Sequence, residues 1–559
     1  MVITVVGAGF DSPLLGDSEI IELLGGIAVF TFLPYCQLRG ANVFVDFFTK
    51  PLPERWKSGL DALMNVVFAA VALVLTWRLI EGGLGAYERS KRSMFLQLPD
   101  WWGYAIGAFS MLLWIAVCLM RVSRFDIGLW MFAGALVLIG LRMPVGVVML
   151  LVGGVGYAAI NGVDPLLNTL KTLPFSQFAN YTLTVIPLFL LMGEFATKAG
   201  MSAALFRAGR AWFGHWRGGL AVATIGGCAA FGAICGSSFA TAATMTRVAG
   251  PEMRKAGYSP ALWTGTLAAG GTLGILIPPS VILVIYAVFT EQSIGALFIA
   301  AIIPGILAAI QYMIVVNLYV RFVPAAVVQM EKATWRERIV ATHGVWPVLL
   351  VFGLVVIGIY RGWFSPTEGA GVGAFATLLM AVWRGGMRLA GLREALLSTG
   401  ETTAMMFLIM LGAQLFSAGL ASSQMPTLFA QKVAGLQASP TVIMLAILVA
   451  YFILGCFMES LAMVLLTLPV FIPLILALDF GMSKDAVLVW FGILVLISVE
   501  VGMISPPFGL NLFLINSMAK DVPMGETYKG VLGFCAMDAV RLALLVFFPL
   551  LALWLPGLR

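Results

Sequence analysis

Long apolar stretches separated by short polar connectors run along most of this chain of 559 residues. A transmembrane helix needs about 20 mainly apolar residues. Three early stretches meet this length, near 20–38, 60–80 and 101–120. A fourth run, 127–160, contains the turn signal Leu141-Arg142-Met143-Pro144, so it predicts either two short crossings or one kinked helix with an extension. The pattern therefore predicts an all-α, polytopic membrane protein.

After a brief return of charge near 122–126, the pattern continues as two similar halves, and we expect a module boundary at this point. Each half contains ordinary spans, a pair of short segments and an apolar stretch broken by two prolines. In the first half these are the spans 184–196 and 294–320, the short pair 218–233 and 237–249, and the break at Pro278-Pro279. In the second half they are the spans 345–360, 369–382 and 402–421, the short pair 442–456 and 460–478, and the break at Pro506-Pro507.

The two proline pairs predict helix breaks at matching places in the two halves. Proline lacks a backbone donor and clashes with the preceding turn, so each pair opens its helix. Free carbonyls at membrane depth are tolerated only where protein or a polar cavity surrounds them. The short pairs fit re-entrant hairpins, which enter and leave on one side. Interrupted segments in corresponding positions of two repeats, commonly inverted, indicate the binding site of a secondary transporter.

Composition and charge agree with this class and exclude others. The chain is 61% hydrophobic and 11% charged, with a formal net charge of +6. Its basic residues cluster in connectors, as at Arg321, Lys332 and Arg336, which is typical of cytoplasmic loops and not of nucleic-acid binding. The six cysteines show no CxxC spacing and there are two histidines, His215 and His343, so no cofactor or histidine-based metal centre is expected.

The tip of the first hairpin is a candidate binding site. Its glycine allows a tight reversal, and its hydroxyls suit a hard cation or the carboxylate of a solute. Carbonyls freed by the first break would complete the oxygen ligands. Small and hydroxyl residues also permit close helix packing, which is the alternative interpretation; the nearby break favours a site. The residues are Gly236, Ser237, Ser238 and Thr241 at the tip, and Gly274, Ile277 and Pro278 at the break.

The second tip and the second break form a corresponding candidate site. Glu459 stands out because a carboxylate at membrane depth is costly and usually faces a cavity or a partner, although a tip residue in water is the alternative. The helices that begin at these tips point positive N-terminal ends inward, which favours an acidic solute. The other residues of this group are Gly455, Thr467, Gly502, Ser505, Pro506 and Asn511.

Within these sets we expect two Na⁺ sites and a shared solute site. The cation ligands are predicted to come from Gly236, Ser237, Ser238, Gly274, Ile277, Pro278, Gly455, Glu459, Gly502, Ser505 and Pro506. The solute is predicted to meet Ser237, Ser238, Thr241, Thr467 and Asn511. The remaining acids in apolar stretches are expected to be structural or interface residues, with Glu368 placed to act as a first-turn helix acid; they are Glu194, Glu368, Glu401, Glu500 and Asp538.

The motifs from about residue 125 to 556 resemble the large M subunit of the tripartite ATP-independent periplasmic (TRAP) transporters. They are the runs 236–243, 251–253, 257–258, 274–280, 366–368 and 505–513. The front of the chain resembles the small Q subunit through Asp11-Ser12-Pro13, Arg39-Gly40, Val45-Asp46 and Leu52-Pro53. The resemblance implies a Q-like module at 1–122, with a first helix that looks truncated, fused to an M-like module at 123–559. Two departures are mild: Glu459 and Ser505 stand where the family usually has Asp and Thr.

The resemblance also implies a mode of action. The M-like part would carry an elevator-type transport domain of the ion-transporter kind on a scaffold that the Q-like part enlarges. A separate periplasmic binding protein would deliver a small organic acid, with Na⁺ as coupling ion, across the bacterial inner membrane in contact with its lipids. The alternatives are a stand-alone ion-coupled carboxylate carrier and an intramembrane enzyme. The enzyme would need a nucleophile with a base or a metal cluster, which the pattern does not supply.

Overall fold

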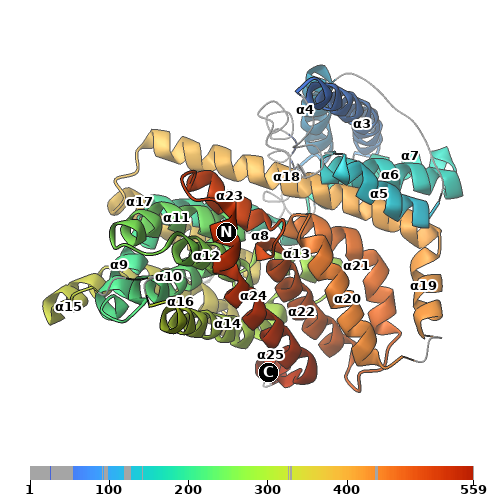
Figure 1. Cartoon of the computed structure of the whole chain (residues 1–559). Helices are drawn as coiled ribbons and strands as arrows, with labels where there is room; N and C mark the ends of the chain where they lie inside the picture. Colours follow the sequence, from blue (N-terminus) through green and yellow to red (C-terminus); the bar gives the residue numbers. More distant parts are fainter. Residues whose placement is uncertain are drawn as a thin grey trace. The chain divides into compact units, whose positions relative to one another are not determined.

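The computed structural model describes residues 26, 30, 54–90, 92–93, 98–118, 127–141, 143–324, 327, 330–434 and 438–557. The elements formed by these residues are helices (Figure 1). Four are long and apolar enough to cross a membrane, and three bent helix pairs raise the number of candidate spans in this part of the chain to as many as seven. The prediction of an all-α protein with several membrane spans is confirmed.

The first of two compact units comprises Met1–Pro187, Leu396–Ala438 and Leu461–Leu478. Its helices are α3 (Glu54–Glu88), α4 (Trp101–Cys118), α5 (Leu129–Gly140), α6 (Val145–Asn161), α7 (Val163–Phe178), the 3₁₀ turn η1 (Tyr181–Thr184), most of α18 (Leu389–Ser422), α19 (Met425–Ala434) and α21 (Ser460–Leu476). The run 127–160 forms two helices, since Pro144 caps α6 and separates it from α5. The expected span 20–38, the boundary at 122–126 and the Q-like motifs lie outside the described residues, apart from residues 26 and 30.

Glycines bring the helices of the first unit together. A Cβ atom on Gly146 would lie 2.9 Å from the backbone of Ile409 in α18, and one on Gly153 would lie 2.5 Å from the backbone nitrogen of Phe416. Because α18 begins at Leu389, it is longer than the span predicted at 402–421, and α3 (Glu54–Glu88) likewise begins before and ends after the apolar stretch predicted at 60–80. Both helices extend beyond their apolar segments into polar sequence, which a hydropathy pattern alone assigns to loops.

The second unit comprises Leu188–Ala395, Ser439–Ser460 and Asp479–Arg559. Its helices are α8 (Val185–Lys198), α9 (Met201–Phe213), α10 (Gly219–Cys235), α11 (Ser238–Lys255), α12 (Pro260–Leu276), α13 (Val281–Phe289), α14 (Ile294–Phe322), α15 (Trp335–His343), α16 (Trp346–Arg361), α17 (Pro366–Trp383), α20 (Pro440–Gly455), α22 (Lys484–Ile504), α23 (Leu510–Met518), α24 (Met524–Phe547) and α25 (Leu550–Gly557). The amphipathic α9 and the span α24 were not predicted from the hydropathy pattern.

Short polar signals start several of these helices. Ser237, Ser280 and Ser293 each cap a helix N-terminus by accepting a hydrogen bond from a backbone N–H three residues on. At α17 the Ser365 hydroxyl and the Glu368 carboxylate form a capping box, with Pro366 at the first helical position. The prediction that Glu368 is a first-turn helix acid is confirmed.

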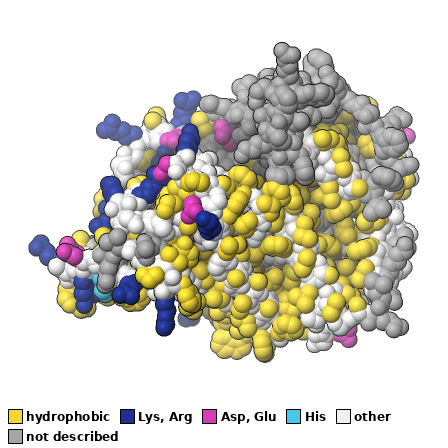
Figure 2. Space-filling model, viewed as in Figure 1, with side chains coloured by type: hydrophobic (Ala, Val, Ile, Leu, Met, Phe, Trp, Pro, Cys, Tyr) yellow, Lys and Arg dark blue, Asp and Glu magenta, His cyan; other side chains and the backbone are white. Residues whose placement is uncertain are grey.

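One face of the second unit is strongly apolar where it is exposed. On α14 the exposed side chains Ile306, Ile310, Ile314 and Leu318 recur every four residues, so they share one stripe. Exposed apolar side chains on α24 and α25 continue the yellow surface over these helices in Figure 2. Large contiguous apolar patches mark contact with a membrane or a partner. Together with the candidate spans, this stripe is best explained by lipid contact.

Candidate functional site

The first predicted short pair forms α10 and α11, joined by a tight tip. Gly236 adopts a left-handed backbone with φ of 64°, which glycine accepts without strain. Ser237 follows as the N-cap of α11, and its hydroxyl accepts a hydrogen bond from the Ala240 backbone N–H at 3.3 Å. Ser238 begins α11 and is fully buried.

The first helix break packs directly against this tip. The helix α12 ends at Leu276, the chain passes through Ile277, Pro278 and Pro279, and α13 begins after Ser280, with a bend of 43° between the two helices. A Cβ atom on Gly274 would lie 2.4 Å from Thr241 Oγ1 and 2.7 Å from the Ser237 carbonyl oxygen. Glycine is therefore required where α12 approaches the tip, and the predicted first set of residues lies together.

The second tip repeats this arrangement. The helix α20 ends at Gly455, and a Cβ atom there would lie 3.0 Å from the Val499 carbonyl oxygen and 3.2 Å from Gly502 Cα on α22. Further along the tip, the rings of Phe457 and Phe508 lie 4.6 Å apart between centroids. The second tip thus contacts both the end of α22 and the segment after the second proline pair.

Ser505 occupies the second break, between α22 and Pro506-Pro507. Its hydroxyl donates to the Val501 carbonyl oxygen at 2.6 Å, and its oxygen lies 3.5 Å from Cys535 Sγ. Thr467 lies on α21 in the first unit, where its hydroxyl donates to the Met463 carbonyl oxygen at 2.8 Å. The ligand roles of these residues remain predictions.

The two halves meet through buried polar side chains of the second unit. Asn511, in the first turn of α23, donates from Nδ2 to Ser238 Oγ at 2.8 Å. Glu500, on α22, accepts a hydrogen bond at Oε1 from Ser460 Oγ at 3.4 Å, and its carboxyl also interacts with the Ser238 side chain. Glu500 therefore lies between the first residues of α11 and α21, which belong to different hairpins.

Glu500 is the residue that sequence reasoning placed outside the site. It is 2% exposed and lies five positions before Ser505. The sequence did contain one signal for this residue, because an acidic side chain lies within about one and a half helical turns before a helix break. The side chains of α22 itself are buried on all faces of the helix. The pattern of apolar residues therefore does not show which neighbouring helix Glu500 faces.

A second cluster of buried polar side chains includes Asp538 and Arg541, which lie about one helical turn apart on α24. Their side chains form an ion pair with 2.7 Å between Arg541 Nη2 and Asp538 Oδ1, and each is 1% exposed. Tyr312 donates to Asp538 Oδ2 at 2.8 Å, and the Tyr312 hydroxyl lies 3.1 Å from Thr272 Oγ1. This network ties α12, α14 and α24 together inside the second unit.

The donor set of the site suits a hard monovalent cation better than a transition metal. Among the described residues no group of three or more His, Cys, Asp or Glu side chains could hold a metal ion. The side chains at the tips and breaks offer hydroxyl, amide and carboxyl oxygens, with freed backbone carbonyls beside them. These are the ligands that hard cations prefer.

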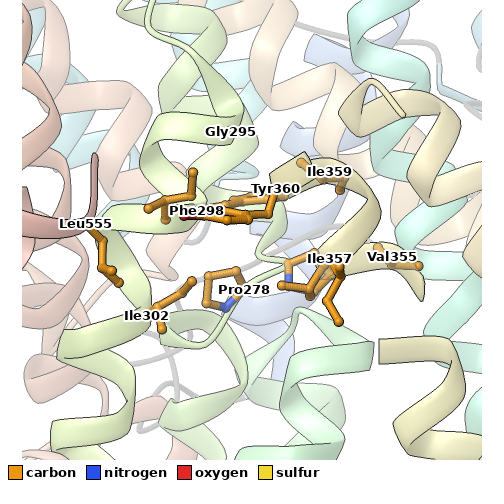
Figure 3. Close-up of a pocket in the computed structure, with 12 residues that line it drawn as sticks. Pro278, Gly295, Phe298, Ile302, Val355, Ile357, Ile359, Tyr360 and Leu555 are labelled. Carbon is orange, nitrogen blue, oxygen red and sulfur yellow. The ribbon is translucent and has the colours of Figure 1, made fainter. Parts of the chain in front are cut away.

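A separate cavity of about 250 Å³ lies behind the first break and is apolar (Figure 3). Pro278 lines it together with residues of α14, α16 and α25, including Phe298, Ile302 and Leu555. Tyr360 is the only side chain of the lining that carries a polar group. A charged solute would lose its hydration there without replacement, so this cavity does not suit an organic acid.

Comparison with known proteins identifies the parts of the chain. The family model described as "Tripartite ATP-independent periplasmic transporter, DctM component" matches residues 132–551. The model described as "Tripartite ATP-independent periplasmic transporters, DctQ component" matches residues 1–126. The two matched segments follow one another in a single chain.

Three relatives show the range of similar proteins. The C4-dicarboxylate TRAP transporter large permease protein DctM of Pseudomonas aeruginosa is 37% identical, over 68% of this chain and 88% of that protein. The ectoine TRAP transporter large permease protein TeaC of Halomonas elongata is 35% identical, over 67% of this chain and 86% of that protein. The isethionate TRAP transporter permease protein DctMQ of Oleidesulfovibrio alaskensis is 26% identical, over 92% of this chain and 85% of that protein.

Solved structures add a similarity of fold. The crystal structure of the Alcanivorax borkumensis YdaH transporter aligns with a TM-score of 0.53 at 16% identity, covering 76% of this chain and 98% of that one. At this identity the likeness concerns the fold alone.

Proposed function

Because the chain belongs to the TRAP transporter family, as a fusion of the small DctQ and large DctM permease components, we propose that it imports a small organic acid by Na⁺ symport. A separate periplasmic binding protein delivers the solute, and the protein resides in the bacterial inner membrane. The chain is a transporter, not an enzyme. C4-dicarboxylate, ectoine, sialic acid and isethionate appear in the names of relatives, and each of these compounds carries a carboxylate or sulfonate group.

One observation carries the assignment of the site. Asn511 of the second broken segment donates to Ser238 of the first tip at 2.8 Å, so the two halves share one buried polar region. The N-termini of α11 and α23 meet at this bond. Helix N-termini favour anions, which supports an acidic solute at this place.

We assign the coupling ions to the two contacts between tip and break. The first site uses Ser237, Ser238 and carbonyls near Gly274 and Ile277, where backbone and side chains lie in direct contact. The second uses carbonyls near Gly455 and Gly502 together with Glu459 and Ser505. Hydroxyl and carbonyl oxygens at both places fit the requirement of Na⁺ for several oxygen ligands.

The transport step is an elevator movement of the hairpins and broken helices as one body. Ser237 and Glu459 lie in the same compact unit, which supports this proposal. Residues 461–476 of α21 belong to the other unit, so the moving body would take in part of both units. Disulfide links between each tip and the scaffold should stop transport, whereas a link between the two tips should be tolerated.

The decisive experiment is uptake into proteoliposomes, with and without the cognate binding protein and an inward Na⁺ gradient. A panel of radiolabelled C4-dicarboxylates, sugar acids and sulfonates supplies the solutes. Uptake is expected only when both the binding protein and Na⁺ are present. Uptake without the binding protein would instead support the stand-alone carboxylate carrier, and uptake independent of Na⁺ would remove the symport.

A further inference from the structure

A cavity of about 350 Å³ lies among helix ends of the second unit, and three cationic side chains line it. They are Lys198 at the end of α8, Arg207 on α9 and Arg384 directly after α17. None of the residues that line this cavity is acidic. Most of the other lining residues are small and leave room between the cations; they are Ala199, Gly200, Ala203, Ala204, Gly344 and Gly385. The cavity therefore favours an anion.

The two arginines of this cavity keep their positive charge available for a ligand. Neither Arg207 nor Arg384 pairs with a carboxylate in the part of the chain that the structure describes. Arg384 donates from Nη1 to the Gly344 carbonyl oxygen at 3.0 Å, which fixes the guanidinium at the cavity wall and leaves its other N–H groups free to donate. Lys198 pairs with Glu394, an exposed carboxylate on α18. The cluster of three cations and one acid thus keeps a net positive charge.

The start of α9 adds backbone donors to the same cavity. Gly200 is the N-cap residue, with a left-handed φ of 71°, and both Gly200 and Met201 line the cavity. Because glycine has no side chain, it cannot accept a hydrogen bond from the first backbone N–H groups of α9. The positive end of a helix favours an anion and suits a phosphate group in particular. This contribution adds to that of the cationic side chains.

Two tryptophans indicate that the cavity lies at the level of a membrane surface. Trp346 is the first residue of α16 and Trp383 is the last residue of α17, and each directly precedes a residue that lines the cavity. Their rings lie 6.4 Å apart between centroids. Tryptophan is enriched at the boundary between membrane and water. On α17 the exposed apolar side chains share one stripe that runs from Trp383 back along the helix, and they are Phe375, Leu379 and Val382.

Basic residues at this end of the spans indicate the cytoplasmic side. The chain reaches α16 through the segment between the last turn of α14 and the first turn of α15, which contains Arg321, Lys332 and Arg336. Such clusters are typical of cytoplasmic loops. The cytoplasmic leaflet carries anionic lipids, and basic pockets between spanning helices on that side bind lipid headgroups. A phospholipid of this leaflet therefore supplies an anion at the depth of the cavity.

We propose that this cavity binds a phosphate group, supplied by the headgroup of an anionic phospholipid in the cytoplasmic leaflet. Arg207 and Arg384 donate to the phosphate oxygens together with the first N–H groups of α9. Lys198 joins them when the phosphate displaces the exposed carboxylate of Glu394. The acyl chains follow the apolar stripe on α17. The bound lipid joins the ends of α8 and α17 to the start of α9, so it stabilises the folded second unit whatever solute the protein carries.

The experiment is thermal unfolding of the purified full-length protein in a neutral detergent, titrated with phosphatidylglycerol, with phosphatidylcholine or with inorganic phosphate. A ligand that binds the native state raises Tm as it saturates. Phosphatidylglycerol should raise the Tm of the wild type, whereas phosphatidylcholine, whose choline cancels the phosphate charge, should raise it less. Each arginine at an anionic lipid accounts for roughly a fivefold change in affinity, so Arg207→Gln/Arg384→Gln should raise the phosphatidylglycerol midpoint roughly twenty-five-fold.

The control is Arg336→Gln/Arg393→Gln, which removes two exposed arginines that do not line the cavity. It should leave the phosphatidylglycerol midpoint unchanged, and a shift as large as that of the lining arginines would overturn the proposal. Should the lining double variant fail to fold, the single variants Arg207→Gln and Arg384→Gln should each shift the midpoint roughly fivefold.

The proposal is overturned if phosphatidylglycerol does not raise the Tm of the wild type, or if the variants of the lining arginines keep the wild-type midpoint. A rise in Tm with inorganic phosphate and none with phosphatidylglycerol would overturn the lipid as the source of the phosphate group.

A variant of Glu394 tests the opposite direction. Glu394→Gln removes the carboxylate that competes with the phosphate for Lys198, so it should lower the phosphatidylglycerol midpoint. A general loss of stability would not strengthen lipid binding, which separates this effect from a purely structural one. An unchanged or higher midpoint would overturn the placement of the phosphate between Lys198 and the two arginines. The titrations need no solute and no binding protein, so their outcome is independent of the proposed transport function.

Discussion

The side-chain amide of Asn511 donates a hydrogen bond to the hydroxyl of Ser238 at 2.8 Å, although 273 residues separate the two in the chain. Asn511 follows the second proline pair and Ser238 begins the second helix of the first hairpin. The bond therefore joins an element of each repeat at one buried point. Glu500 accepts a hydrogen bond from Ser460, so the second hairpin also contacts this region.

Removing the Ser238 hydroxyl should weaken cation binding. Ser238→Ala deletes a proposed Na⁺ ligand and leaves Asn511 Nδ2 buried without its acceptor, so the apparent Na⁺ affinity should fall about tenfold, or about 1.4 kcal/mol. Ser505→Ala should have a comparable effect at the second site. The measurement is Na⁺-dependent uptake or Na⁺-dependent thermal stabilisation.

The control for these variants is Ser517→Ala, on the same helix as Asn511. Ser517 is exposed, and its hydroxyl donates only locally, to the Leu514 carbonyl oxygen. Its removal should change neither expression nor Na⁺ dependence. Unchanged Na⁺ affinity in both Ser238→Ala and Ser505→Ala, at normal expression, would remove the Na⁺ assignment.

A methyl group at Gly274 should force the first tip away from the first break. The new Cβ atom would lie 2.4 Å from Thr241 Oγ1 and 2.7 Å from the Ser237 carbonyl oxygen, so backbone must move. Overpacking of this kind costs about 1–3 kcal/mol. We expect Gly274→Ala to lower Tm and to abolish uptake. Gly525→Ala is the matched control, because a Cβ atom there meets nothing within 4 Å; equal behaviour of the two variants would contradict the close contact.

Loss of Arg541 should be strongly destabilising. Arg541→Met leaves Asp538 buried without its cation, which costs about 3–5 kcal/mol in comparable buried pairs. Adding Asp538→Asn should restore much of the stability, because the uncompensated charge is then gone. Differential scanning measurements of the two single variants and the double variant give the coupling. An additive double variant would show that the two side chains do not depend on each other.

The control for this pair is the exposed contact between Lys529 and Glu526, on the same helix and at the same spacing. Exposed ion pairs contribute about 0–1 kcal/mol. Lys529→Met should therefore leave Tm nearly unchanged, and a loss as large as that of Arg541→Met would point to a general effect of removing charge from α24.

Damage to the front module should lower assembly without altering solute choice. Arg78 of α3 is 4% exposed and donates to the Leu167 carbonyl oxygen and to Asn168 on α7. Arg78→Met should reduce the yield of folded protein. Arg89→Met should not, because Arg89 is an exposed residue directly after α3 and donates locally, to the Gly85 carbonyl oxygen. Replacing residues 1–122 with the corresponding module of another fused permease should keep the ranking of solutes in uptake. A changed ranking would show that the front module helps to form the site.

Much of the fold followed from sequence for identifiable reasons. The proline pairs predicted both helix breaks, and the two pairs of short apolar segments predicted both hairpins with their tips. The contacts of Gly274 with the first tip and of Gly502 with the second agree with the expected pairing of tip and break. The extension of α18 back to Leu389 was missed, because polar residues there continue the helix beyond its apolar segment. The placement of Thr467 in a unit separate from the other predicted site residues was also beyond sequence reasoning.

The sequence by itself determined the membrane class, the helix breaks and the family, since these depend on local composition and on motifs that are contiguous in the chain. Only the tertiary structure decided which buried polar groups meet. Asn511, Ser238, Glu500 and Ser460 lie far apart in the chain but come together in the second compact unit, where Asn511 bonds to Ser238 and Glu500 to Ser460. The direction of Glu500 could not be read from α22, since a helix surrounded by protein has apolar residues on every face and no periodicity to orient it.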